Sequence, residues 1–138
     1  YVVSHFDGEF DGLNLVIDCS NGASYRIAPK IFKKLNSSFY LIGDKPDGKN
    51  INVGCGALDT ELMRKTVLKR KSFCGISYDG DGDRCILSDE NGRVIDGDDI
   101  IALLAAYYKK NGKLKNNIVV LTQMANYGLV KFLKKETN

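Results

Sequence analysis

Three aspartates stand at alternate positions in the run Tyr78–Arg84 (YDGDGDR), namely Asp79, Asp81 and Asp83. Glycine adopts backbone angles that other residues avoid, so this loop can curl and direct its acidic side chains toward one point. Without a cation that convergence is unfavourable, because unit charges about 4 Å apart repel by ~4 kcal/mol near a protein surface. Carboxylates in this number suit Mg²⁺, Mn²⁺ or Ca²⁺ rather than zinc or copper. The spacing therefore predicts a cation site rather than a solvated acidic turn.

An EF-hand is a second interpretation of the same residues. With Asp79 as loop position one, Asp81 falls at position three, Asp83 at five and Glu90 at twelve, as a calcium loop requires. Arg84 stands where that loop has glycine, and the flanking sequences predict a strand and a hairpin rather than two helices. An EF-hand-like module that binds a divalent cation and has no catalytic activity is therefore an alternative.

Two other motifs are incomplete. The run Gly43–Asn50 follows a predicted strand and approaches the Walker A pattern, but Asn50 replaces the serine or threonine that binds Mg²⁺. Pro46 has no N–H for phosphate, and Asp47 would repel it. The pair Ser4-His5 could suggest a nucleophile and its base, but adjacent residues of a strand point to opposite faces. Neither a nucleotide site nor a nucleophilic pair is expected.

Composition and length favour one ordinary domain, residues 1–138. The chain has 138 residues, of which 43% are hydrophobic, and this is enough for a buried core. It begins at Tyr1 without a signal-peptide pattern or an apolar membrane span, so we expect a segment of a larger protein that contacts no membrane. The four cysteines form no Cys-x-x-Cys pair, which favours reduced thiols and a cytoplasmic location.

The net charge of +3 conceals a division along the chain. Residues 79–99 hold eight acidic side chains against two arginines, a local charge of −6, which leaves +9 on the rest. The basic residues gather toward the ends of predicted helices, where cations complement the helix dipole. Because these clusters are dispersed and lack interleaved aromatic residues, we expect no nucleic-acid partner.

Strand and helix patterns alternate along the sequence, which is typical of an α/β fold. We expect a three-layer αβα sandwich with a mostly parallel mixed sheet and one antiparallel strand. In such a sheet the aspartate loop leaves the carboxyl end of a strand, where ligands gather. The predicted strands are 13–19, 38–42, 73–77, 85–88, 93–95 and 118–122, and the predicted helices are about 29–35, 60–70 (capped by Asp59), 98–110 and 127–135.

The strings GISYDGDGDRCIL and NGRVIDGDDI resemble the metal-binding loop and its continuation in the second of four domains of the α-D-phosphohexomutase superfamily. VIDCSNGASYRIAP and GDKPDGKNINVGCGALD are similar to the branch of that superfamily that acts on an amino-sugar phosphate. The similarity extends from about Asp11 to about Lys134. It implies the metal-binding domain of a larger isomerase.

The resemblance implies that glucosamine 6-phosphate and glucosamine 1-phosphate interconvert through a bisphosphorylated intermediate and an enzyme phosphoserine. Asp79, Asp81 and Asp83 would hold Mg²⁺, and Arg84 would contact phosphate. Relatives that act on glucose or mannose phosphates are the alternative. Phosphoryl transfer depends on positioning and on neutralising phosphate oxygens, which a carboxylate-bound ion and a guanidinium can provide.

Part of the family's site is not in this sequence. Ser4-His5 is followed by Phe6-Asp7 rather than by the Asn-Pro of the family's phosphoserine loop, and Gln123–Asn126 differs from the usual Met-Ser-Asn. The expected partners are therefore the other domains of the same enzyme and its phosphosugar substrate. The chain alone should be inactive.

Overall fold

The computed structural model describes residues 3–5 and 10–137. It divides into two compact units, Tyr1–Val94 and Ile95–Asn138, where composition predicted a single domain 1–138. The reason is that each unit packs around its own apolar residues, so they are described separately. Among the described residues, no helix has the length and apolar character needed to cross a membrane.

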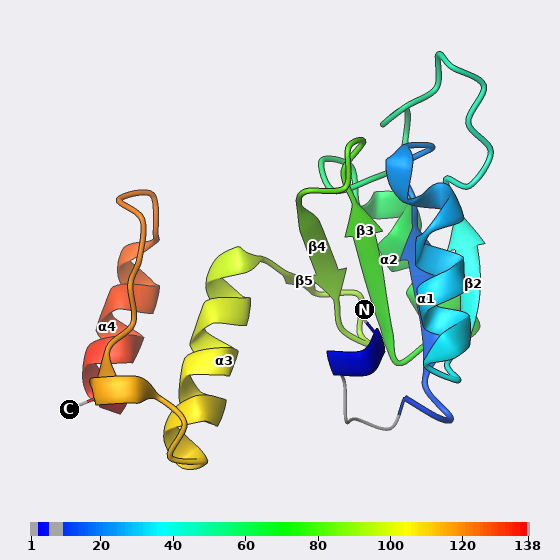
Figure 1. Cartoon of the computed structure of the whole chain (residues 1–138). Helices are drawn as coiled ribbons and strands as arrows, with labels where there is room; N and C mark the ends of the chain where they lie inside the picture. The colour runs from blue at the N-terminus through cyan, green and yellow to red at the C-terminus, as the bar shows by residue number, and fades with distance from the viewer. Residues whose placement is uncertain (1–2, 6–9, 138) are drawn as a thin grey trace. The chain divides into compact units, whose positions relative to one another are not determined.

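A mixed five-stranded sheet forms the centre of the first unit (Figure 1). Strand β1 lies parallel to β2 on one side and to β3 on the other, and β4 is antiparallel to β3. This confirms the predicted α/β fold and most of its strands. In the order β2-β1-β3-β4-β5, the strands are Ser38–Ile42, Asn14–Asp18, Cys74–Tyr78, Cys85–Ser88 and Val94–Ile95.

Two helices, α1 (Ala28–Lys34) and α2 (Glu61–Arg70), cover opposite faces of this sheet (Figure 1). Successive side chains of a strand point to opposite faces, so Ile17 packs with Phe32 of α1 while Val16 packs with Met63 of α2. The first unit therefore has the three layers expected from its sequence. Pro29 lies in the first turn of α1, where its missing N–H costs no hydrogen bond.

The second unit contains the helices α3 (Gly97–Lys110) and α4 (Tyr127–Thr137). The segment 111–126 joins them and includes a short 3-10 turn, η3 (Lys115–Asn117). Asp96 and Asp99 form a capping box at the start of α3. At α4, the Asn126 side chain accepts the Leu129 N–H at 2.8 Å, so this part of the unusual Gln123–Asn126 run is a helix cap.

The prediction of a strand at 118–122 is wrong, because the structure has no strand after β5 among the residues that it describes. A strand needs a neighbour to satisfy its backbone groups, and none of the described strands pairs with this segment. Ile118 is 62% exposed and Val120 88%. One smaller boundary also differs, since Thr60 rather than Asp59 is the N-cap of α2.

Candidate cation site

The aspartate loop connects β3 to β4 at the carboxyl end of β3, as the sequence predicted. The Asp79 N–H donates to the Arg84 carbonyl at 3.1 Å, which closes the loop. Gly82 has a φ of +80°, a left-handed conformation that side chains other than glycine rarely adopt. Alternate residues of β3 are buried, and Asp79 continues this alternation one step beyond the strand. Its carboxylate is therefore directed inward.

Asp79 is 3% exposed and accepts hydrogen bonds from its own loop. Its Oδ1 accepts the N–H groups of Gly82 and Arg84 at 3.1 and 3.0 Å, and its Oδ2 accepts Arg84 Nε at 2.9 Å. The bonds from Arg84, above all the one from its backbone N–H, lower the pKa of Asp79 to about 2. Asp79 is therefore ionised at any physiological pH.

Asp81 and Asp83 are exposed at the tip of the same loop. One carboxylate oxygen from each of Asp79, Asp81 and Asp83 lies within 4.8 Å of the other two. The pKa of Asp83 is raised, first by a hydrogen bond with Asp79 and then by the negative charge of Asp81. The predicted convergence of the three carboxylates is therefore present in the fold.

The three residues fit a small divalent cation. The ligand oxygens of an octahedral ion, each at about 2.1 Å, are about 3.0 Å apart when adjacent and about 4.2 Å apart when opposite. The three oxygens here, within 4.8 Å of one another, would therefore need only small shifts to bind one ion. Asp79 is held rigidly by the loop, whereas Asp81 and Asp83 face solvent and can adjust. Hard carboxylate oxygens match Mg²⁺ and Mn²⁺.

Arg84 lies beside these carboxylates rather than apart from them. Its Nε is 2.9 Å from Asp79 Oδ2 and 3.4 Å from Asp83 Oδ1, while its side chain is 69% exposed. The resemblance implies a phosphate contact for Arg84. In the structure its Nε orients Asp79, and its side chain is mostly exposed.

Neighbouring segments hold the loop through contacts that the sequence analysis missed. The N–H groups of Ala57 and Ala23 donate to the carbonyls of Tyr78 and Gly80, at 3.0 and 2.8 Å. Gly22 lies directly against Gly80, and a Cβ on either glycine would overlap its neighbours. Gly80 therefore provides space rather than an unusual backbone angle, which no local pattern could indicate.

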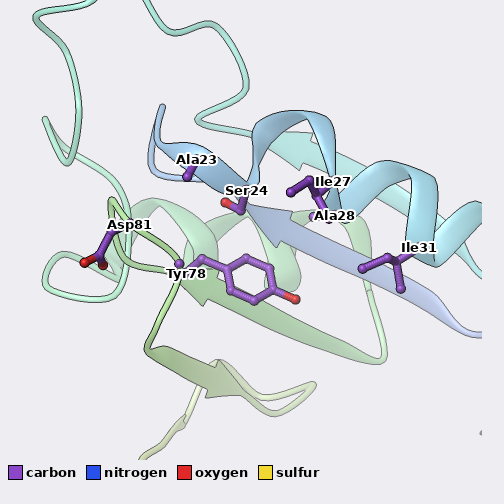
Figure 2. Close-up of a pocket in the computed structure, with 8 residues that line it drawn as sticks. Ala23, Ser24, Ile27, Ala28, Ile31, Tyr78 and Asp81 are labelled. Atoms are coloured by element: carbon purple, nitrogen blue, oxygen red, sulfur yellow. The ribbon is translucent and has the colours of Figure 1, made fainter. Parts of the chain in front are cut away.

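A pocket of about 220 Å³ opens beside the loop, between it and α1 (Figure 2). In Figure 2 the Tyr78 ring lies beneath Ile27 and Ala28 with its hydroxyl toward Ile31, and Asp81 stands at the other end. Burial raises the pKa of Tyr78 to about 12. The apolar residues of α1 were the available signal for this pocket, but the sequence analysis used them only to predict a helix.

The other sequence motifs do not form sites. The EF-hand interpretation is wrong, because strands rather than helices flank the loop and the acidic group found among the described residues does not include Glu90. In the Walker-like run, Asp47 Oδ1 accepts the N–H groups of Lys49 and Asn50, so these are not free for phosphate. Ser4-His5 lies in the 3-10 helix η1 (Val3–His5), and Phe6-Asp7 lies outside the described residues.

Of the four cysteines, which are all free, two are buried, Cys19 and Cys55, whereas Cys74 is half-buried and Cys85 is exposed. The basic residues lie as predicted, since all four α-helices carry lysine or arginine in their last turn.

Two sequence-family models match this chain, and the boundary between their matches falls at the boundary between the two units of the fold. Residues 5–92 match the sequence model of phosphoglucomutase/phosphomannomutase, alpha/beta/alpha domain II, and residues 96–137 match domain III of the same family. The resemblance had placed nearly the whole chain in the second domain. The second unit therefore resembles the next domain instead.

Individual relatives match most of the chain. A phosphoglucosamine mutase of Ruthia magnifica subsp. Calyptogena magnifica is 48% identical over 118 residues, which are 86% of this chain and 27% of the relative. One from Alkaliphilus oremlandii is 47% identical over 94% of this chain and 29% of its own length. The chain thus spans less than a third of these relatives. A phosphoglucomutase/phosphomannomutase family protein from Burkholderia thailandensis shares the fold, with a TM-score of 0.62 and 23% identity over 72% of this chain and 22% of that one.

Proposed function

Because the chain belongs to the phosphoglucomutase/phosphomannomutase family, we propose that its first unit is the Mg²⁺-binding part of a phosphoglucosamine mutase. Such an enzyme interconverts glucosamine 6-phosphate and glucosamine 1-phosphate, a step toward amino-sugar and cell-wall precursors. The observation that carries the proposal is the convergence of Asp79, Asp81 and Asp83 at the end of β3. The 47–48% identity to proteins of that name supports the choice of sugar.

Each residue of the loop has a distinct part in this proposal. Asp79, Asp81 and Asp83 would hold the ion, which when bound neutralises phosphate oxygens during transfer. Arg84 keeps Asp79 ionised and correctly oriented through its backbone and side-chain N–H groups. Its exposed guanidinium can also bind a phosphate group of the substrate.

The rest of the reaction falls to other parts of the enzyme. The phosphoserine and the groups that recognise the sugar would come from further domains of the same protein, so the 138-residue chain alone should show no turnover. We also place the enzyme in the cytoplasm, where phosphosugars occur and thiols stay reduced. The proposed partners include neither nucleic acid nor a membrane.

A hybrid enzyme tests the function. Residues 10–137 would replace the matching segment of the Ruthia magnifica phosphoglucosamine mutase, and turnover would be measured with glucosamine, glucose and mannose 6-phosphates. We expect preference for the glucosamine substrate, with loss of activity in Asp81→Asn. Asp89→Asn is the matched control, because Asp89 has the same charge but accepts the N–H groups of Asn91 and Arg93 in the β4–β5 turn. Preference for glucose or mannose phosphate would favour the alternative.

Ion binding by the chain alone tests the site directly. Calorimetric titration should show Mg²⁺ and Mn²⁺ binding that Asp81→Asn weakens and Asp89→Asn leaves unchanged. A strong preference for Ca²⁺ would contradict a site for a small octahedral ion.

A further inference from the structure

A buried carboxylate outside the loop, that of Asp18, lies at the carboxyl end of β1 and is fully shielded from solvent. Its Oδ1 accepts the Ser20 N–H at 2.9 Å. Its Oδ2 accepts the Gly56 N–H at 2.6 Å and the Ser77 hydroxyl at 3.0 Å. One side chain thus joins three segments that are far apart in the sequence.

Two of these bonds lead to the aspartate loop. Ser77 is the register partner of Asp18 on the neighbouring strand β3 and stands two residues before Asp79. Gly56 precedes Ala57, whose N–H donates to the Tyr78 carbonyl at 3.0 Å. Asp18 therefore holds both β3, through Ser77, and the Gly56–Ala57 segment that bonds to the end of β3, where the loop begins.

The chemistry of this contact requires a carboxylate. Two N–H groups and a hydroxyl point at Asp18, and an ionised carboxylate can accept from all of them because it has no donor of its own. An asparagine of the same shape would direct its NH₂ group at one or more of these donors. Burial raises the pKa of Asp18, so the native fold keeps this carboxylate despite an electrostatic cost.

We propose that Asp18 is a positioning residue for the cation site, which it aligns through Ser77 and through the Gly56–Ala57 segment. This inference rests on the proposed cation role of the loop. It assigns Asp18 no contact with the ion. It predicts that the affinity of the loop for a cation depends on the Asp18 side chain, although that side chain forms its hydrogen bonds with residues outside the loop.

The test compares Mn²⁺ affinity across variants of the 138-residue chain, with free Mn²⁺ measured by electron paramagnetic resonance. Asp18→Asn should weaken binding about 10-fold, as loss of an outer-shell partner commonly does. Ser77→Ala, which removes one of the bonds, should weaken it less. The matched controls are Asp89→Asn and Ser88→Ala, since Ser88 is a buried serine of β4 whose hydroxyl donates to the Asp89 carbonyl. Both controls should bind Mn²⁺ like the parent.

Amide hydrogen exchange supplies a readout that needs no ion. In Asp18→Asn, exchange should accelerate at Ala57 and Ala23, whose N–H groups hold the loop, more than at amides of α2. A role in global stability alone would accelerate all of them together and would leave Mn²⁺ affinity unchanged in the folded protein.

The outcomes separate the two proposals. If Asp18→Asn does not fold, Ser77→Ala decides, and parental Mn²⁺ affinity in that folded variant overturns the positioning role. If the parent itself binds no Mn²⁺, the cation role of the loop is overturned. The exchange comparison then decides by itself whether Asp18 holds the loop, and uniform acceleration in Asp18→Asn overturns that claim.

Discussion

The two units of this chain bury their apolar residues to very different extents. In the first, both faces of the sheet are covered, and Val16, Ile17, Met63 and Val67 are fully buried. In the second, the buried core consists of Ala105, Leu129 and Leu133, while neighbouring apolar side chains stay exposed. The first unit therefore has the packing that stabilises a fold, whereas the second depends mostly on local helix signals.

This contrast shows which elements can form from local sequence. Helices α3 and α4 satisfy their backbone groups within themselves and need only caps and an apolar stripe. The segment 118–122 has an equally apolar sequence but cannot form a strand without a neighbour. Apolar side chains in and just after this segment consequently stay exposed, as Met124 is to 90%.

Separating the two units should have the largest effect. We expect a chain of residues 1–95 to keep a cooperative urea transition, followed by circular dichroism. A chain of residues 96–138 should lose cooperativity, because helices of 14 and 11 residues are marginal in water without a larger core. Cooperative unfolding of residues 96–138 at moderate urea would show that its small core suffices, and the contrast drawn above would fail.

Core truncation sharpens the contrast within the intact chain. Met63→Ala should lower the free energy of unfolding of the first unit by about 3 kcal/mol, since Met63 is fully buried against β1. Leu129→Ala, at 5% exposure in the second unit, should leave that main urea transition in place and reduce helix content instead. Equal shifts of the main transition by both variants would indicate one cooperative structure.

Acid should act on the first unit through Asp79. Its folded pKa, about 2, lies below its ordinary value of about 3.9, so the folded state binds fewer protons than the unfolded state. The stability that Asp79 contributes is complete well above pH 4 and is lost as the pH falls toward 2. Melting curves from pH 6 to 2 in chelator should therefore decline less in Asp79→Asn than in the parent. The Ser88→Ala control removes no ionisable group and should keep the parental slope.

The smallest effect is expected at the cap of α3. Asp96→Ala removes the acceptor for the Asp98 and Asp99 N–H groups, which should cost about 1 kcal/mol within the helix. Amide exchange in α3 should rise about 5-fold, while the first unit melts unchanged. Asp96→Asn keeps a capping side chain and should behave like the parent. A shift in the first unit's melting temperature would mean that the two units unfold together.

Much of the fold and the centre of the site could be predicted because their signals are local. The apolar runs of β1 to β4, the periodic faces of the helices and the turn residues each act over a few positions. The same holds for the loop, where Asp79, Asp81 and Asp83 are two residues apart and any tight turn at the end of a strand brings them together. The residue types and their spacing were therefore sufficient to predict a cation site.

Tertiary structure decided what depends on residues far apart in the sequence. Asp18 meets Gly56 and Ser77, which lie 38 and 59 positions away, and no periodic pattern marks such a contact. The division into two units and the missing strand at 118–122 depend likewise on which apolar surfaces find a partner. Backbone hydrogen bonds and apolar burial between distant segments are properties of the assembled sheet. For this reason the sequence determined the candidate ligands of the site, and only the fold determined what holds them in place.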